Sequence, residues 1–163
     1  MEMHTLVLST GSNLGNRLAN LLSAAEQIGQ RLGSVVQSSA VYEGRAWGFK
    51  SKHAFYNQCL EVRTGMNPRE CLERILEIER EMGRERNNSG YSDRIIDIDI
   101  LFYDELVVDT SELRIPHEKM LERRFVLLPL AEILPGFKHP VAMETVQSLL
   151  ENCPDAMELH RVS

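Results

Sequence analysis

Two aspartates stand two residues apart in a strongly apolar segment, residues 94–102. In an extended strand the side chains at i and i+2 leave the same face, so Asp97 and Asp99 point together while Ile98 and Ile100 point the other way. Carboxylates are hard oxygen ligands, and Mg²⁺ usually takes one or two of them and completes its shell with water and substrate phosphates. The spacing therefore predicts a magnesium site. The alternative interpretation is an amphipathic edge strand that exposes both aspartates to solvent.

Arginines gather around this pair although the chain as a whole is acidic, with a formal net charge of -6. An acidic chain is not expected to bind nucleic acid through bulk electrostatics, which requires a basic face. Guanidinium groups form paired hydrogen bonds with phosphate oxygens, and carboxylate-bound Mg²⁺ binds the same oxygens. The combination predicts a polyphosphate site, whereas the alternative for residues 84–86 is a solvated helix end. The arginines concerned are Arg80, Arg84, Arg86, Arg94, Arg114, Arg123 and Arg124.

The bulk properties are those of one domain that spans residues 1–163, with 43% hydrophobic and 26% charged residues. No basic segment followed by an apolar run opens the chain, and no stretch approaches the roughly 20 apolar residues that a membrane helix requires. We therefore expect a cytoplasmic protein without membrane contact, and nothing demands more than a monomer. The 3 cysteines are far apart and odd in number, which argues against a disulfide scaffold or a zinc site.

Hydrophobic periodicity predicts the order of the elements that position these residues. We expect strands at 5–10, 35–42, 55–62 and 94–102 and helices at 14–32 and 67–83. The order strand, helix, strand, strand, helix, strand is typical of an α+β, ferredoxin-like antiparallel sheet with both helices on one face. Further helices at 124–133 and 143–151 would cover the other face and complete a three-layer α/β/α architecture. Val107 and Val108 suggest a short hairpin partner for the acidic strand.

Two polar loops flank these elements. Residues 43–54 carry Trp47, the only tryptophan. A long loop with aromatic residues is typical of a binding loop or lid, the alternative being that Trp47 packs on the domain. Residues 84–93 are placed to fold over a bound polyphosphate and to bring Arg84 or Arg86 with them. Glu79 lies on the apolar stripe of the preceding helix, where a carboxylate needs a partner, either an arginine or a ligand.

Several segments together resemble the 6-hydroxymethyl-7,8-dihydropterin pyrophosphokinase family of folate biosynthesis. They run in the order of the family over nearly the whole chain, which makes the set far more specific than any one motif. The matching residues are Gly11-Ser12-Asn13-Leu14-Gly15, Phe55-Tyr56-Asn57, Glu79, Gly83-Arg84-x-Arg86, Arg94-x-x-Asp97-Ile98-Asp99-Ile100-Leu101, Pro116-His117 and Arg123-x-Phe125-Val126-Leu127-x-Pro129-Leu130.

The resemblance implies a reaction, its ligands and a set of site residues. The family moves the β,γ-pyrophosphoryl unit of ATP to the hydroxymethyl oxygen of the reduced pterin and releases AMP. By resemblance, Asp97 and Asp99 hold two Mg²⁺ ions, and Arg84 and Arg94 complete the catalytic group. The ATP-binding residues implied in the same way are Glu79, Arg86, Tyr91, Arg94, Ile100, Arg114, His117 and Arg123. Those implied for the pterin are Gly44, Arg45, Trp47, Phe55, Asn57 and Phe125, with the two phenylalanines as stacking groups and the asparagine reading the edge.

Two departures from the family pattern concern the same site. Residues 44–46 are Gly-Arg-Ala where the family usually has Thr-x-Pro or Thr-Pro-Pro, which predicts a more mobile pterin loop because proline restricts the backbone. Asp93 precedes Arg94 and puts a negative charge near the triphosphate. Two other functions remain open, a magnesium-dependent phosphodiesterase that uses the same groups and a non-catalytic nucleotide- or pterin-binding module. The presence of Asp97, Asp99, Arg84 and Arg94 argues against the second.

Overall fold

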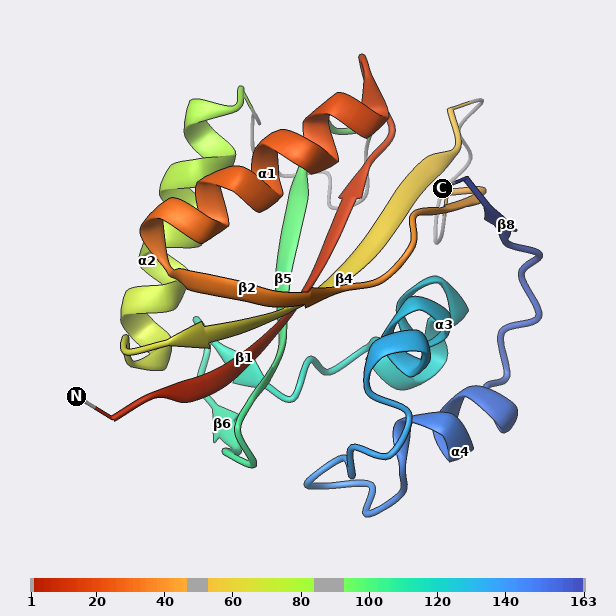
Figure 1. The fold of residues 1–163 in the computed structure, drawn as a ribbon. Helices are drawn as coiled ribbons and strands as arrows, with labels where there is room; N and C mark the ends of the chain where they lie inside the picture. Colours follow the sequence, from red (N-terminus) through yellow and green to blue (C-terminus); the bar gives the residue numbers. More distant parts are fainter. Residues whose placement is uncertain (1, 47–52, 84–92, 163) are drawn as a thin grey trace.

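The structure is a computed structural model that describes residues 2–46, 53–83 and 93–162. The elements follow the predicted order, with short additions after the acidic strand (Figure 1). They are β1 (His4–Ser12), α1 (Arg17–Arg31), β2 (Gly33–Ser38), β3 (Tyr42–Gly44), β4 (Phe55–Thr64), α2 (Pro68–Glu81), β5 (Asp97–Tyr103), β6 (Val108–Asp109), β7 (Arg114–Ile115), the 3-10 turn η1 (Met120–Glu122), α3 (Arg124–Ile133), α4 (Val146–Glu151) and β8 (His160–Arg161).

The main sheet is antiparallel and has the strand order β5-β1-β4-β3-β8, with β2 also paired to β4. Counting β2 and β3 as one interrupted strand, the first four strands in the sheet have the ferredoxin-like order, so the predicted fold class is confirmed. β1 lies between β4 and β5, and both of these neighbours run antiparallel to it. Residues distant in sequence therefore meet at one end of the sheet.

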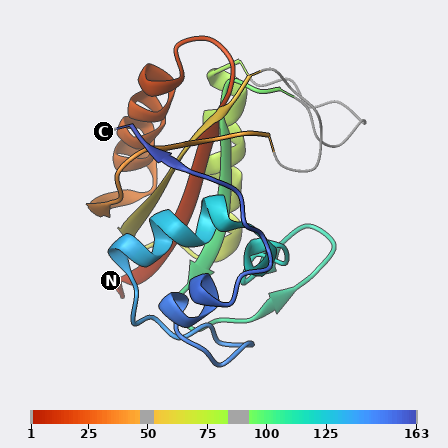
Figure 2. The same cartoon turned by 90° about the vertical axis from the view of Figure 1, so that its right-hand side faces the viewer.

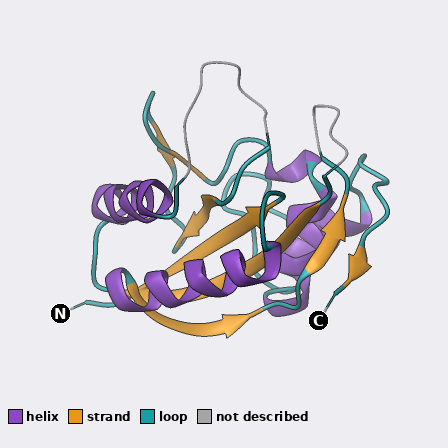
Figure 3. Ribbon diagram, turned by 90° about the horizontal axis from the view of Figure 1, so that it is seen from above, coloured by secondary structure: helices purple, strands orange, loops and turns teal. Residues whose placement is uncertain are grey.

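Helices cover both faces of this sheet, which confirms the three-layer prediction (Figures 2 and 3). Leu6 and Leu8 of β1 point toward α1 and α2 and join one core cluster. Val7 points to the opposite face and joins a second cluster with residues of α3 and α4. All three side chains are fully buried, as the two-residue period of a strand between two helical layers requires.

The segment 35–42, predicted as one strand, forms two. β2 ends at Ser38 and β3 begins at Tyr42, and both lie beside β4. At the break, the Ser39 amide donates to the Cys59 carbonyl at 2.9 Å, and Ser39 Oγ accepts from the Cys59 amide at 2.9 Å. Because a side chain takes over one of the backbone bonds, the two strands pair with β4 as separate elements.

Local capping signals set the helix ends. Asn67 caps α2 by accepting from the Glu70 amide, and Glu70 accepts in return from the Asn67 amide, which forms a complete capping box. Asn16 caps α1, so that helix begins three residues later than predicted. The hairpin prediction for Val107 and Val108 was wrong in its partner, because Val108 pairs with Ile115 of β7 rather than with β5. None of the helices in the described ranges is both long and apolar enough to span a membrane.

Candidate active site

Three neighbouring strands place an acid, a glycine and an amide in one row across the sheet. The register pairs Asp97 of β5 with Gly11 of β1, and Gly11 with Asn57 of β4. Directly opposed residues share a face, so the side chains of Asp97 and Asn57 leave the sheet on the same side. A Cβ at Gly11 would lie 2.8 Å from Asn57 Oδ1 and 3.5 Å from Phe55 Cδ1. The glycine thus keeps space free between the acid and the amide.

The two aspartates lie together on the face that α3 covers. Their side chains are partly exposed, 25% for Asp97 and 35% for Asp99, whereas Ile98 and Ile100 are buried in the core under α1 and α2. The alternation follows the two-residue period predicted from the sequence. Within the described ranges no group of three or more His, Cys, Asp and Glu residues could hold a metal ion.

Arg94 lies beside the first of these aspartates. Its Nη1 is 3.3 Å from Asp97 Oδ2, and its side chain is only 14% exposed. Arg123, which is also largely buried, sits at the N-terminal end of α3 with its guanidinium 5.6 Å from the centre of the Phe125 ring. Arg94 therefore holds a positive charge beside Asp97, and Arg123 adds a largely buried positive charge that acts on His117.

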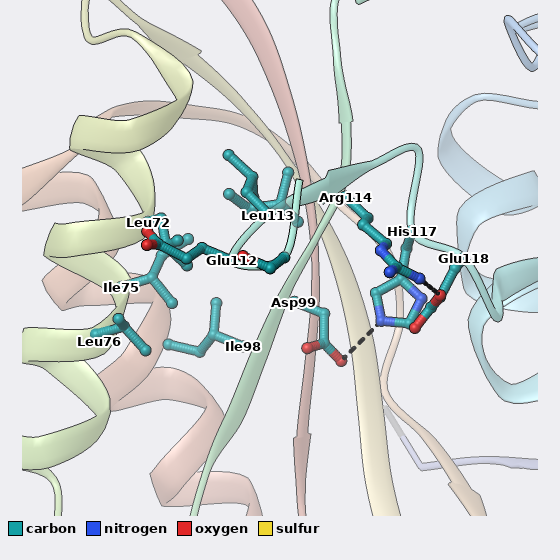
Figure 4. A pocket seen from close by; sticks show the side chains of 12 residues that line it. Leu72, Ile75, Leu76, Ile98, Asp99, Glu112, Leu113, Arg114, His117 and Glu118 are labelled. Atoms are coloured by element: carbon teal, nitrogen blue, oxygen red, sulfur yellow. Dashed lines mark hydrogen bonds and ion pairs between the residues drawn. The ribbon is translucent and has the colours of Figure 1, made fainter. Parts of the chain in front are cut away.

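His117 faces the second aspartate, with Nε2 4.0 Å from Asp99 Oδ2 (Figure 4). Burial, together with the nearby positive charge of Arg123, lowers the pKa of His117 to about 4. The imidazole is therefore neutral near pH 7, and the Asp99 contact is not an ion pair at that pH. Its Nδ1 accepts from the Lys119 amide at 3.2 Å, so the proton resides on Nε2. His117 thus presents an N–H donor on the side of Asp99.

A cavity of about 390 Å³ runs around the edge of β5 from Asp99 to α2 (Figure 4). Its polar end holds Asp99, Arg114 and His117. Arg114 is tied to Glu118 and lies 3.3 Å from Asp109. The apolar wall of the cavity is formed by Leu72, Ile75, Leu76, Ile98, Ile100 and Leu113. Of these six wall residues, only Ile100 was predicted from the sequence as a site residue. The leucines of α2 were indistinguishable from core positions, because their helical spacing predicts burial alone.

Glu79, the carboxylate on the apolar stripe, is 2% exposed. Its Oε2 accepts from the Ile98 amide of β5 at 2.8 Å. β5 lies at the edge of the main sheet, and its outward amides require acceptors from outside the sheet. A backbone amide of the acidic strand is therefore one partner of Glu79, whereas the sequence predicted an arginine or a ligand.

The residues implied for the pterin come from β3, β4 and α3. Asn57 is 4% exposed, and Phe55, two residues earlier, leaves the same face of β4. Phe125 packs partly against the core under α3. Gly44 is backed by the C-terminal segment, since a Cβ there would lie 2.5 Å from Leu159 Cδ2. Arg45 is exposed and lines a cavity of about 480 Å³ with Gly44 and the C-terminal segment. Trp47, Arg84, Arg86 and Tyr91 lie outside the described residues.

Comparison with known proteins gives a consistent result. Residues 7–135 match the family described as 7,8-dihydro-6-hydroxymethylpterin-pyrophosphokinase. A 2-amino-4-hydroxy-6-hydroxymethyldihydropteridine pyrophosphokinase of Porphyromonas gingivalis is 41% identical over 143 residues, which cover 86% of this chain and 97% of that protein. The protein of the same name from Aquifex aeolicus is 39% identical over 139 residues, 85% of this chain and 86% of that protein.

Other relatives are much longer than this chain. The folic acid synthesis protein FOL1 of Dictyostelium discoideum is 36% identical over 156 residues, which are 95% of this chain and 23% of that protein. The chain thus spans about a quarter of that relative. The solved structure of Plasmodium falciparum HPPK-DHPS with pterin and p-hydroxybenzoate superimposes with a TM-score of 0.73 at 20% identity, covering 93% of this chain and 42% of that one. This likeness confirms the fold.

Proposed function

The chain belongs to the 7,8-dihydro-6-hydroxymethylpterin-pyrophosphokinase family, and from this premise we propose that it transfers the β,γ-pyrophosphoryl group of ATP to the hydroxymethyl oxygen of 6-hydroxymethyl-7,8-dihydropterin, with release of AMP. The observation that carries the proposal is the row formed by Asp97, Gly11 and Asn57. In this row the carboxylate of Asp97, on the proposed phosphate side, and the buried carboxamide of Asn57 lie on one face of the sheet, with only Gly11 between them. Donor and acceptor substrates can then meet over Gly11.

Mg²⁺ is the metal that we propose for this site, as two ions held by Asp97 and Asp99. The donor set fits, because both ligands are hard carboxylates, both are partly exposed, and they leave the same face of β5. When bound, the metal would neutralise charge on the triphosphate oxygens and acidify the hydroxymethyl group. No side chain then needs to act as a strong general base.

The remaining roles follow from where charge develops. Negative charge accumulates on AMP as the α–β bond breaks, and fixed cationic donors stabilise it most when they need not reorganise. Arg94 is held by Asp97 and is mostly buried, which gives it a defined orientation. Arg114, Arg123 and the Nε2–H of His117 are the other donors that we propose for phosphate oxygens. The apolar wall with Leu72, Leu76 and Leu113 would hold the adenine.

The pterin is flat, with hydrogen-bonding groups at its edges. We propose that Phe55 and Phe125 stack on its faces and that Asn57 binds its edge, since a carboxamide both donates and accepts. Gly44 and Arg45 would line the same subsite. We further propose a single domain over residues 1–163 that acts as a cytoplasmic monomer on these two small substrates, without a nucleic-acid partner.

The neutral His117 predicts how stability depends on pH. The unfolded chain takes up a proton near the usual histidine pKa of about 6.5, and the folded chain does so only near about 4. The unfolded state therefore binds more protons between these values, and stability is lost as the pH falls from 6.5 toward 4. We expect wild type to lose about 1 to 2 kcal/mol more than His117→Gln between pH 7 and pH 5, measured by urea unfolding at both values. Equal losses would contradict the neutral, buried imidazole.

The function is tested by phosphorus NMR of the protein mixed with Mg²⁺-ATP and 6-hydroxymethyl-7,8-dihydropterin. AMP together with a pterin diphosphate is the expected result. Hydrolysis of ATP that does not require pterin would favour the phosphodiesterase, and unchanged ATP would favour a binding module. Either of those outcomes would overturn the proposal.

A further inference from the structure

Asn13 lies one residue beyond the end of β1 and is 2% exposed. At this end of the sheet, β1 finishes while β4 and β5 begin (Figure 1). In the sequence, Asn13 belongs to the segment Gly11-Ser12-Asn13-Leu14-Gly15, one of those that carry the family resemblance. A buried asparagine needs partners for its carboxamide, and those partners decide what it holds together.

Asn13 makes four hydrogen bonds to segments that are remote in sequence. Its backbone amide donates to the Arg94 carbonyl at 3.1 Å, and its side-chain Oδ1 accepts from the Arg94 backbone amide at 2.7 Å. Its Nδ2 donates to Asp93 Oδ1 at 2.7 Å and to the His53 carbonyl at 3.2 Å. Both hydrogens of Nδ2 are therefore used, and one side chain joins the residues before β4 to those before β5.

These two segments carry the two halves of the proposed site. Arg94 contacts Asp97 on the phosphate side. His53 comes two residues before Phe55, at the start of the strand that also carries Asn57. The bonds of Asn13 therefore fix the backbone of the phosphate-side arginine relative to the strand that carries the pterin residues.

We propose that Asn13 is a positioning residue for pyrophosphoryl transfer and that Asp93 is its required acceptor. The inference rests on the proposed function. Transfer between two substrates depends on their alignment, and a displacement of about 1 Å can cost about a hundredfold in rate. Asp93, which the sequence predicts to place a negative charge near the triphosphate, accepts with its Oδ1 from the Asn13 carboxamide.

The chemistry of the contact suggests a reversal experiment. Asn13→Asp keeps an acceptor for the Arg94 amide but removes both donors and sets two carboxylates against each other. Adding Asp93→Asn restores the hydrogen bond in the opposite direction, because the carboxamide at position 93 now donates to the carboxylate at position 13. We expect Asn13→Asp to lower kcat about 30- to 100-fold, with KM for each substrate changed less than about threefold, and the double variant to recover at least about tenfold of kcat.

A matched control separates positioning from stability. Thr145→Ala removes the side-chain cap of α4, a helix that supplies no residue to either proposed substrate site, and should lower the melting temperature without lowering kcat. The proposal fails if kcat follows the melting temperature across wild type, Asn13→Asp, the double variant and the cap variant. It also fails if the double variant is no more active than Asn13→Asp. Asp93→Ala, which removes a partly exposed acceptor of Asn13, should lower kcat about three- to tenfold even if Asn13→Asp folds poorly.

Amide hydrogen exchange tests the inference without reference to activity. Asn13→Ala removes the acceptor of the Arg94 amide, so that amide should exchange at least about tenfold faster, whereas Asn13→Asp should retain its protection. If the wild-type protein makes no pterin diphosphate but the Arg94 amide exchanges faster in Asn13→Ala, the proposed function is overturned. The role of Asn13 in joining the two segments is then still supported. If wild type is active but Asn13→Ala shows unchanged Arg94 exchange and unchanged turnover, the positioning role of Asn13 is overturned and the proposed function stands.

Discussion

An Asp97→Asn variant is expected to retain its fold and to lose about a thousandfold or more of kcat. The amide has the shape of the carboxylate but no charge. It is therefore a poor ligand for Mg²⁺, and it also ends the ion pair that orients Arg94 at 3.3 Å. AMP release measured under saturating substrates gives kcat, and calorimetric titration of ATP at several Mg²⁺ concentrations reports the metal dependence of binding.

The control for this substitution is Glu105→Gln, which removes one negative charge from an exposed turn after β5. It should leave kcat and the Mg²⁺ dependence of ATP binding as in wild type. If Asp97→Asn turned over at more than about a tenth of the wild-type rate, Asp97 would have no essential part in the reaction, and the acidic pair would be the solvent-facing edge that its spacing also allows.

The second large effect is expected at a residue that bears no side chain. Gly11→Ala would place a methyl group 2.8 Å from Asn57 Oδ1, closer than nonbonded atoms tolerate. The close contact is with the end of the Asn57 side chain, which can move. The variant should therefore fold, and the carboxamide should turn away from its present orientation. We expect KM for the pterin to rise about 10- to 100-fold, because a misplaced amide leaves an edge group of the substrate unpaired.

The affinity for Mg²⁺-ATP distinguishes this effect from general damage. It should change less than about threefold in Gly11→Ala, because the proposed metal ligands lie on the neighbouring strand and should keep their exposure. Gly136→Ala is the matched control, since a Cβ at Gly136 meets nothing within 4 Å. An unchanged pterin KM in Gly11→Ala would remove Asn57 from the pterin site, whereas equal losses for both substrates would indicate a distorted sheet.

Local sequence signals were sufficient for several features of the fold. The two-residue period places Asp97 and Asp99 on one face because a strand alternates its side chains regardless of what surrounds it. The cap at Asn67 and the helical period after it predict α2 for equally local reasons. The break between β2 and β3 was missed because it depends on the contact of Ser39 with Cys59, 20 residues away in the chain.

By itself, therefore, the sequence determined the element order, the shared face of the aspartates, the concentration of arginines and, through its motifs, the family. Only the tertiary structure decided which of these groups meet. Gly11, Asn57 and Asp97 form a row because strand register is a property of the whole packed sheet. The leucines of α2 line a cavity because α2 lies beside the edge of β5. Asn13 holds two distant segments together because folding buries its carboxamide, and a buried polar group is stable only with partners.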